Sequence, residues 1–173
     1  MKTLPALLVV LVAGLLTSCA STGGGAGGGI VEVNYKSPET FTDMGRTDMA
    51  SRGADEGYLV ELRDYIQRTG KNRLPAGSTL AVTITDVDMA GRFEPERGPQ
   101  LNDVRMVRAI YPPRIQLSYR LTDVAGVVRS EGERQLTDTA FEYKLSPIDR
   151  NDPLRHEKAL MDDFLRNVAS EVK

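Results

Sequence analysis

The side chains best suited to chemistry in this sequence are Cys19, the pair Asp86 and Asp88, and His156. Cys19 is the only cysteine and His156 the only histidine among 173 residues. A single cysteine cannot form an internal disulfide, and a single histidine excludes the two-histidine zinc motif. A Ser–His–Asp triad could use only His156, and no G-x-S-x-G elbow supports it. The remaining chemistry is modification of Cys19 and carboxylate chemistry at the aspartates.

Cys19 follows an N-terminus with the three parts of a signal peptide. Lys2 supplies positive charge, residues 4–16 form an apolar run of 13 residues, and Leu16-Thr17-Ser18 precede the cysteine. The run is shorter than the about 20 residues of a spanning helix. Its end resembles the lipobox of bacterial lipoproteins, in which a diacylglycerol donor alkylates the thiol. We predict a signal peptide over residues 1–18 and a lipid on Cys19, because lipidation removes an otherwise reactive free thiol.

The residues after Cys19 indicate a tether and a destination. In lipoproteins of Gram-negative bacteria, Ala20 in place of Asp implies sorting to the outer membrane. The glycine tract at residues 23–28 formally matches G-x-G-x-x-G, but that dinucleotide fingerprint must follow a strand and open a helix. We interpret residues 19–29 as a lipidated cysteine and a flexible tether spanning roughly 17 Å. The expected partner here is the lipid bilayer, through acylated Cys19.

Composition limits what the remaining chain can do. Removing Lys2 with the signal peptide leaves 21 basic against 24 acidic residues, a net charge of −3. Such a weakly acidic chain lacks the electrostatic footprint of a nucleic-acid-binding protein. Residues 30–173 are enough for one domain of ordinary size with a real core.

Asp86 and Asp88 form the most site-like pair in this domain. Two residues apart on a strand, their side chains would point to one face about 7 Å apart. Such a pair, with Asp43 or Asp138 added, could hold a divalent cation or share acid and base roles. The alternative, which we favour, is that both aspartates end a strand and accept bonds from backbone N–H groups of the turn at residues 89–91.

A second polar group surrounds Pro112-Pro113. Arg105, Arg108 and Arg114 cluster there, and with Asp103 they could form an anion or partner site. A salt-bridged, exposed sheet face is the interpretation we favour. The candidate polar site from sequence is therefore Asp86, Asp88, Arg105 and Arg114, without a cofactor or bound metal.

Hydrophobic periodicity predicts the elements that position these residues. Alternation of apolar and polar residues predicts strands at 30–35, 80–85, 103–110, 114–122 and 127–136, with a loop at 91–99. One-sided apolar spacing predicts a helix at 58–69 that Gly70 ends, and a last helix that Asp152 caps with Pro153 at its first position. His156 then falls in the first turn, on a solvated surface.

The order of these elements predicts the fold class. Local hairpins predominate, so we expect a single α+β domain with a mostly antiparallel sheet of four to five strands. Two amphipathic helices would pack on one face of this sheet. Residues 37–55 and 139–150 receive no assignment.

Four stretches together resemble the bacterial domain-of-unknown-function family 3016, over about residues 31–166. That family is known from secreted and lipidated proteins of Gram-negative bacteria and has no assigned activity, so the resemblance carries over no functional residue. The stretches are Phe41-Thr42-Asp43, Leu74-Pro75-Ala76-Gly77 through Asp86-Val87-Asp88-Met89-Ala90-Gly91, Asp103-Val104-Arg105 with Pro113-Arg114-Ile115, and Leu136-Thr137-Asp138.

The sequence thus favours a membrane-anchored envelope lipoprotein whose domain is a non-enzymatic binding or scaffolding module, with another envelope protein as a partner. One alternative is a metal-dependent hydrolase that uses Asp86 and Asp88. The other is a carrier of an apolar ligand, which would need a cavity between the sheet and the helices.

Overall fold

The computed structural model describes residues 28–44, 54–94, 96, 98, 100 and 104–171. The predicted signal peptide, Cys19 and most of the tether lie outside the described residues. The elements in chain order are β1 (Ile30–Tyr35), the short 3-10 helix η1 (Pro38–Thr40), α1 (Ala54–Arg73), β2 (Thr79–Asp88), β3 (Arg92–Phe93), β4 (Arg105–Met106), β5 (Arg114–Thr122), β6 (Val128–Thr137) and α2 (Arg155–Ser170).

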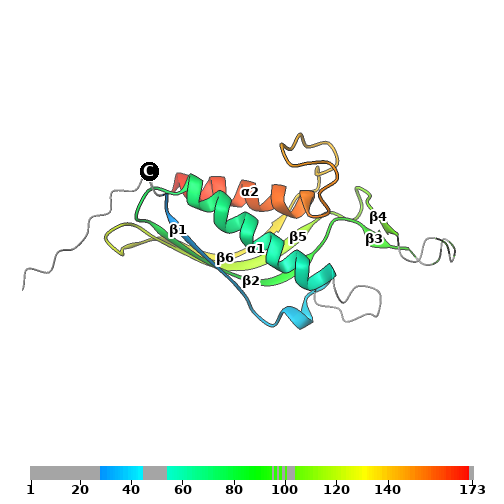
Figure 1. Cartoon of the computed structure of the whole chain (residues 1–173), viewed down its shortest axis with the longest axis horizontal. Coiled ribbons are helices and arrows are strands. Elements are labelled where there is room, and N and C mark those ends of the chain that lie inside the picture. The colour runs from blue at the N-terminus through cyan, green and yellow to red at the C-terminus, as the bar shows by residue number, and fades with distance from the viewer. Residues whose placement is uncertain are drawn as a thin grey trace, which may run out of the picture.

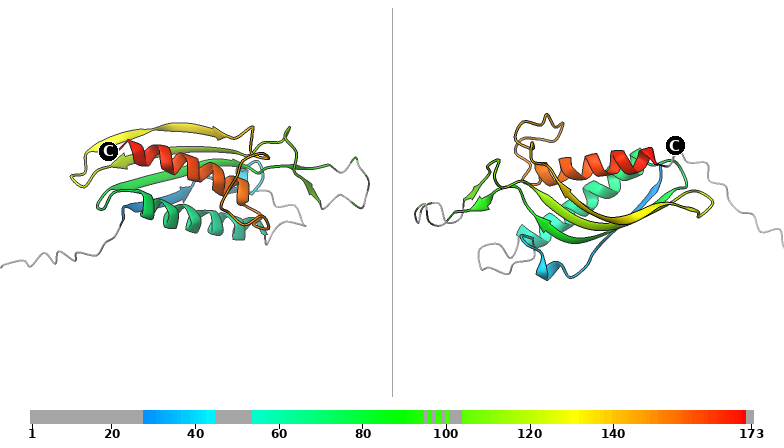
Figure 2. Two further views of the ribbon diagram at one scale, coloured as in Figure 1. Left: turned by 90° about the horizontal axis from the view of Figure 1, so that it is seen from above. Right: turned by 180° about the vertical axis from the view of Figure 1, so that it is seen from behind.

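Four strands form the main sheet in the order β1-β2-β5-β6. β1 pairs parallel to β2 because α1 connects them, whereas β2–β5 and β5–β6 are antiparallel. Figures 1 and 2 show α1 and α2 side by side on one face of this sheet. The prediction of an α+β domain with a mostly antiparallel sheet and both helices on one face is confirmed.

The core lies between the sheet and the two helices. On β5 the side chains that point to the helices are all buried, as the alternation predicted: Ile115, Leu117, Tyr119 and Leu121. On α2 the predicted apolar stripe is buried too: Leu154, Leu160, Met161, Phe164, Leu165 and Val168. β6 is an edge strand with most of its residues exposed.

The first helix is longer than predicted, and Gly70 does not end it. α1 runs from Ala54 to Arg73. A Cβ on Gly70 would lie 2.7 Å from Cγ2 of Val31 and 3.3 Å from Cδ2 of Leu165. Gly70 therefore lies where α1 packs closely against both β1 and α2. Packing at this crossing outweighs the about 1 kcal/mol that glycine costs inside a helix.

Two further boundaries differ from the sequence prediction. The predicted strand at 103–110 is reduced to Arg105–Met106, which pairs with β3 from the predicted loop to form a separate two-stranded sheet. α2 begins at Arg155 rather than at Pro153. Asp152 still serves the helix start, because its carboxylate accepts a 2.8 Å bond from the amide of Leu154.

The buried face of β5 gives a stability prediction. Leu117 is 2% exposed. Leu117→Ala should lower the free energy of unfolding by about 2–5 kcal/mol, through lost burial and the cavity left behind. The neighbouring Gln116 points to the opposite, exposed face, so Gln116→Ala should change it by less than about 0.5 kcal/mol. Urea denaturation measures both, and equal losses would contradict the assigned faces.

Candidate functional site

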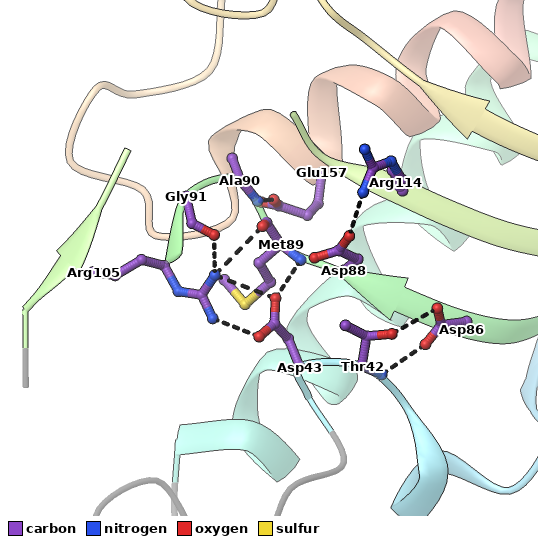
Figure 3. Close-up of polar contacts among 10 residues, drawn as sticks. All are labelled: Thr42, Asp43, Asp86, Asp88, Met89, Ala90, Gly91, Arg105, Arg114 and Glu157. Atoms are coloured by element: carbon purple, nitrogen blue, oxygen red, sulfur yellow. Dashed lines mark hydrogen bonds and ion pairs between the residues drawn. The ribbon is translucent and has the colours of Figure 1, made fainter. Parts of the chain in front are cut away.

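The candidate polar residues gather where β2 ends (Figure 3). β2 contributes Asp86 and Asp88, and the segment after η1 contributes Asp43. Three cations or acids from later elements join them: Arg105 from β4, Arg114 from β5 and Glu157 from α2. We refer to these six residues as the strand-end cluster.

The backbone at residues 89–91 lies at the centre of the strand-end cluster. Three consecutive amides donate there: Met89 to Oδ2 of Asp43 at 2.6 Å, Ala90 to Oε1 of Glu157 at 2.8 Å, and Gly91 to the carbonyl of Tyr111 at 3.0 Å. Gly91 has φ 84°, a conformation that favours glycine. A Cβ on Gly91 would also lie 2.8 Å from the carbonyl oxygen of Met106. This turn is therefore fixed from three sides.

Arg105 attaches the small β3–β4 sheet to this turn. Its guanidinium makes two bonds to Asp43, of 2.7 and 3.2 Å, and a third of 2.8 Å to the carbonyl oxygen of Gly91. The two side chains are each 20% exposed. Bidentate, partly buried pairs of this kind are among the stronger charge-assisted contacts. Arg105 also lies over the ring of Phe93, at 4.9 Å from the centroid.

Asp86 and Asp88 lie on one face of β2, as predicted, with buried Val87 between them. Their predicted bonds to the following turn are wrong. Asp86 accepts from the amide and hydroxyl of Thr42, at 2.7 and 2.9 Å, and Asp88 accepts from Arg114 at 3.0 Å. Asp43 takes the N–H group of the turn instead. The partners come from neighbouring elements, because the strand is bordered on both sides.

The carboxylate of Asp88 is affected by its burial and by the charges around it. Burial raises the pKa of Asp88, the hydrogen bond from Arg114 opposes that rise, and the negative charges of Asp43 and Asp86 add to it. A partly buried carboxylate next to like charges is a feature that is common at functional sites. Within the described part of the chain, however, no group of three or more His, Cys, Asp or Glu side chains is placed to hold a metal ion.

Each of the three arginines around Pro112-Pro113 pairs with a different carboxylate, and two of them, Arg105 and Arg114, belong to the strand-end cluster. Arg105 pairs with Asp43, Arg108 with Glu94 at 3.6 Å, and Arg114 with Asp88. The three arginines form ion pairs, but they do not form the predicted exposed sheet face, because Arg105 is partly buried and only Arg114 lies on the main sheet. Asp103 lies outside the described residues.

Glu157 is the most buried member of the strand-end cluster and is not among the candidate residues predicted from the sequence. Glu157 is 1% exposed. Its Oε2 is buried and has no hydrogen-bond partner among the described residues. Burial raises its pKa, and the hydrogen bond from the amide of Ala90 opposes that rise. Its position three residues after Leu154 and four before Met161 places it on the apolar stripe of α2, and that spacing could have identified it.

His156 and Asp138, two further candidates from the sequence, lie outside the strand-end cluster. The predicted solvated position of His156 is wrong: its ring packs edge-on against Phe141, with centroids 4.8 Å apart. Burial lowers the pKa of His156, and the charge of Arg155 adds to that effect. Asp138 accepts bonds from the amide of Ala140 and the ammonium of Lys144. The chain thus uses Asp138 to shape the turn after β6.

A groove lies elsewhere, between β6 and α2. Its volume is about 660 Å³, within the range of about 300–1,000 Å³ typical of ligand sites. α2 crosses the sheet without covering all of β6, which leaves this space open to solvent at the edge strand. Apolar side chains and charged residues both line it, among them Leu136, Leu160, Phe164, Val168, Arg134 and Lys144.

The fold and the two candidate sites define a small α+β domain with both helices on one face of an antiparallel-rich sheet. Residues 29–167 match the family model described as "Protein of unknown function (DUF3016)", so the chain belongs to this family. No curated protein matches the chain. Among the described helices, none is both long and apolar enough to cross a membrane.

The buried carboxylate of Glu157 predicts a pH effect on stability. A folded-state pKa above the ordinary value means that the folded protein holds a proton after the unfolded chain has lost it, so stability falls as pH rises above about 4.3. Glu157→Gln keeps the shape and the acceptor for Ala90. It should therefore raise the melting temperature at pH 7.5 and have little effect near pH 4.

Thermal unfolding across pH 4–8 measures this difference. Glu131→Gln is the matched control, because Glu131 is exposed on β6 and should show no pH-dependent gain. A Glu157→Gln protein that is less stable than the original by the same amount at every pH would contradict the prediction.

Proposed function

We propose that this protein is a membrane-anchored envelope lipoprotein whose folded domain is a non-enzymatic binding module. Acylated Cys19 would hold it in a bilayer, and Ala20 would direct it to the outer membrane, facing the periplasm. Its partner would be another envelope component, and nucleic acid is not expected because the mature chain is weakly acidic.

The proposal that the domain is not an enzyme rests on one observation: the candidate catalytic carboxylates are already hydrogen-bonded to other groups of the chain. Asp43 binds Arg105 and the amide of Met89, Asp86 binds Thr42, and Asp88 binds Arg114. A general acid, base or metal ligand needs oxygen lone pairs directed at a substrate or ion. Here the described bonds direct them at the chain's own backbone and arginines, which supports a structural role.

The groove between β6 and α2 is the binding site that this proposal favours. It combines an apolar floor that includes Phe164 and Leu136 with charged side chains such as Arg134 and Lys144. Beside it, β6 is an edge strand of the sheet. Edge strands present unpaired backbone groups to which an extended segment of a partner can add.

Two alternatives keep some support. The negative charges of Asp43 and Asp86 close to Asp88 are the observation that favours a metal-dependent hydrolase. Micromolar binding of calcium, magnesium or zinc that Asp86→Ala abolishes would make the hydrolase the preferred function. The groove itself favours a carrier of an apolar ligand. Lipid that copurifies with the domain, and is lost in Phe164→Asp while folding is retained, would indicate a carrier.

The anchoring part makes a direct prediction. Mass spectrometry of the mature protein should show a chain that begins at Cys19 and carries more than one acyl group. One acyl chain alone binds membranes only marginally, whereas several make the anchor permanent. Cys19→Ser should release the protein from the membrane fraction. Lys36→Ser provides a control that should stay bound. A mature N-terminus at another residue would contradict the proposal.

A further inference from the structure

Four exposed apolar side chains lie at the end of the domain where β1 begins. Val124 and Val127 lie in the β5–β6 turn and are 79% and 53% exposed, Val128 at the start of β6 is 42% exposed, and Ile30 at the start of β1 is 58% exposed. Figures 1 and 2 show this turn at the same end of the sheet as the first residues of β1. The sheet register agrees, because Ile30 pairs with Thr79 and Thr79 with Thr122.

The β5–β6 turn holds its valines outward by internal bonds. The carboxylate of Asp123 accepts from the amides of Ala125 and Val127, at 2.9 and 3.0 Å, and from Arg129 at 2.8 Å. Gly126 adopts φ 77°, which favours glycine. The acid of the turn is thus satisfied by its own chain, and the valines remain the groups available to a second surface.

The length of the chain before β1 identifies that surface. Cys19 and Ile30 are eleven positions apart, with ten residues between them. A glycine-rich tether of this length spans about 18 Å on average and at most about 38 Å when fully extended. β2 alone contributes 10 residues, or about 33 Å of sheet length. If Cys19 is anchored, the average span of the tether keeps the start of β1 and the β5–β6 turn nearer to the bilayer than the strand-end cluster, which lies at the other end of β2.

We propose that the β5–β6 turn, together with Ile30, docks on the phospholipid surface that holds the anchor. This inference rests on the proposed lipidation of Cys19. The valines would enter the boundary between headgroups and acyl chains, as the apolar residues of other interfacial segments do. Lys71 is exposed beside the tether exit, where its backbone lies next to Gly28, and its charge suits anionic headgroups. Docking would direct the strand-end cluster away from the membrane.

The chain contains no tryptophan, so a single introduced tryptophan reports on its own position. Val127→Trp places the reporter in the turn, and Ile110→Trp places it near the strand-end cluster, where Ile110 is 69% exposed. Both mature, acylated proteins would be reconstituted into vesicles of phosphatidylethanolamine and phosphatidylglycerol with brominated acyl chains. Circular dichroism verifies folding, and Val124→Trp replaces Val127→Trp if that variant fails to fold.

The inference predicts that brominated lipid quenches Val127→Trp at least threefold more than Ile110→Trp, with a blue-shifted emission only for the turn reporter. Equal quenching of an acylated, vesicle-bound protein would overturn the docking while leaving the anchor intact. A blue shift without quenching would mean that another protein copy covers the turn, and would also overturn it. A mature protein that carries no acyl group and does not float with vesicles would contradict the proposed function itself.

Discussion

The structure depends on three consecutive backbone N–H groups that follow β2 and have no strand partner. An unsatisfied buried amide costs about 1–3 kcal/mol, so Met89, Ala90 and Gly91 each need an acceptor. They find it in Asp43, Glu157 and the carbonyl of Tyr111. These acceptors come from the segment after η1, from α2 and from the connection before β5. One turn therefore joins the parts of the chain that the main sheet does not join.

This requirement explains why Asp43 and Glu157 are engaged, whereas Asp86 and Asp88 are held by Thr42 and Arg114. Asp43 is shared between an amide and Arg105, which in turn carries the β3–β4 sheet. In the function that we propose, binding uses surfaces that do not take part in the packing of the core. The groove beside β6 and the exposed β5–β6 turn are such surfaces, and they lie outside the strand-end cluster. An anchored protein with a membrane-facing turn would present its groove in a fixed orientation to the periplasm.

Periodicity in the sequence predicts the elements that pack against the core and fails where contacts are long-range. β5 and the stripe of α2 follow from spacing, because burial of one face repeats every two residues on a strand and about every 3.6 on a helix. β3 and β4 are two residues each and leave no periodic signal. The sequence predicts that Gly70 ends the helix, because the close approach of Gly70 to Val31 cannot be inferred from residues so far apart in the chain. Asp86 and Thr42 are 44 positions apart, so local turn chemistry could not find their bond. Glu157 is an exception among the long-range contacts, since its spacing from the apolar residues of α2 is enough to predict that it is buried.

Hydrogen exchange at Met89 and Ala90 tests most directly whether the carboxylates of the strand-end cluster have the structural role of holding the turn at residues 89–91. Because both amides are hydrogen-bonded and buried, both should exchange as slowly as the amides in the centre of β2. Asp43→Asn should accelerate exchange at Met89 by at least about tenfold, because the Met89 amide then loses its hydrogen bond to a charged group, which contributes about 1.5–3 kcal/mol. The amide of Ala125, bonded to Asp123 in an exposed turn, is the internal reference and should not change. Fast exchange at Met89 and Ala90 in the unaltered protein, as fast as at Ala125, would contradict the account and leave the carboxylates available for chemistry.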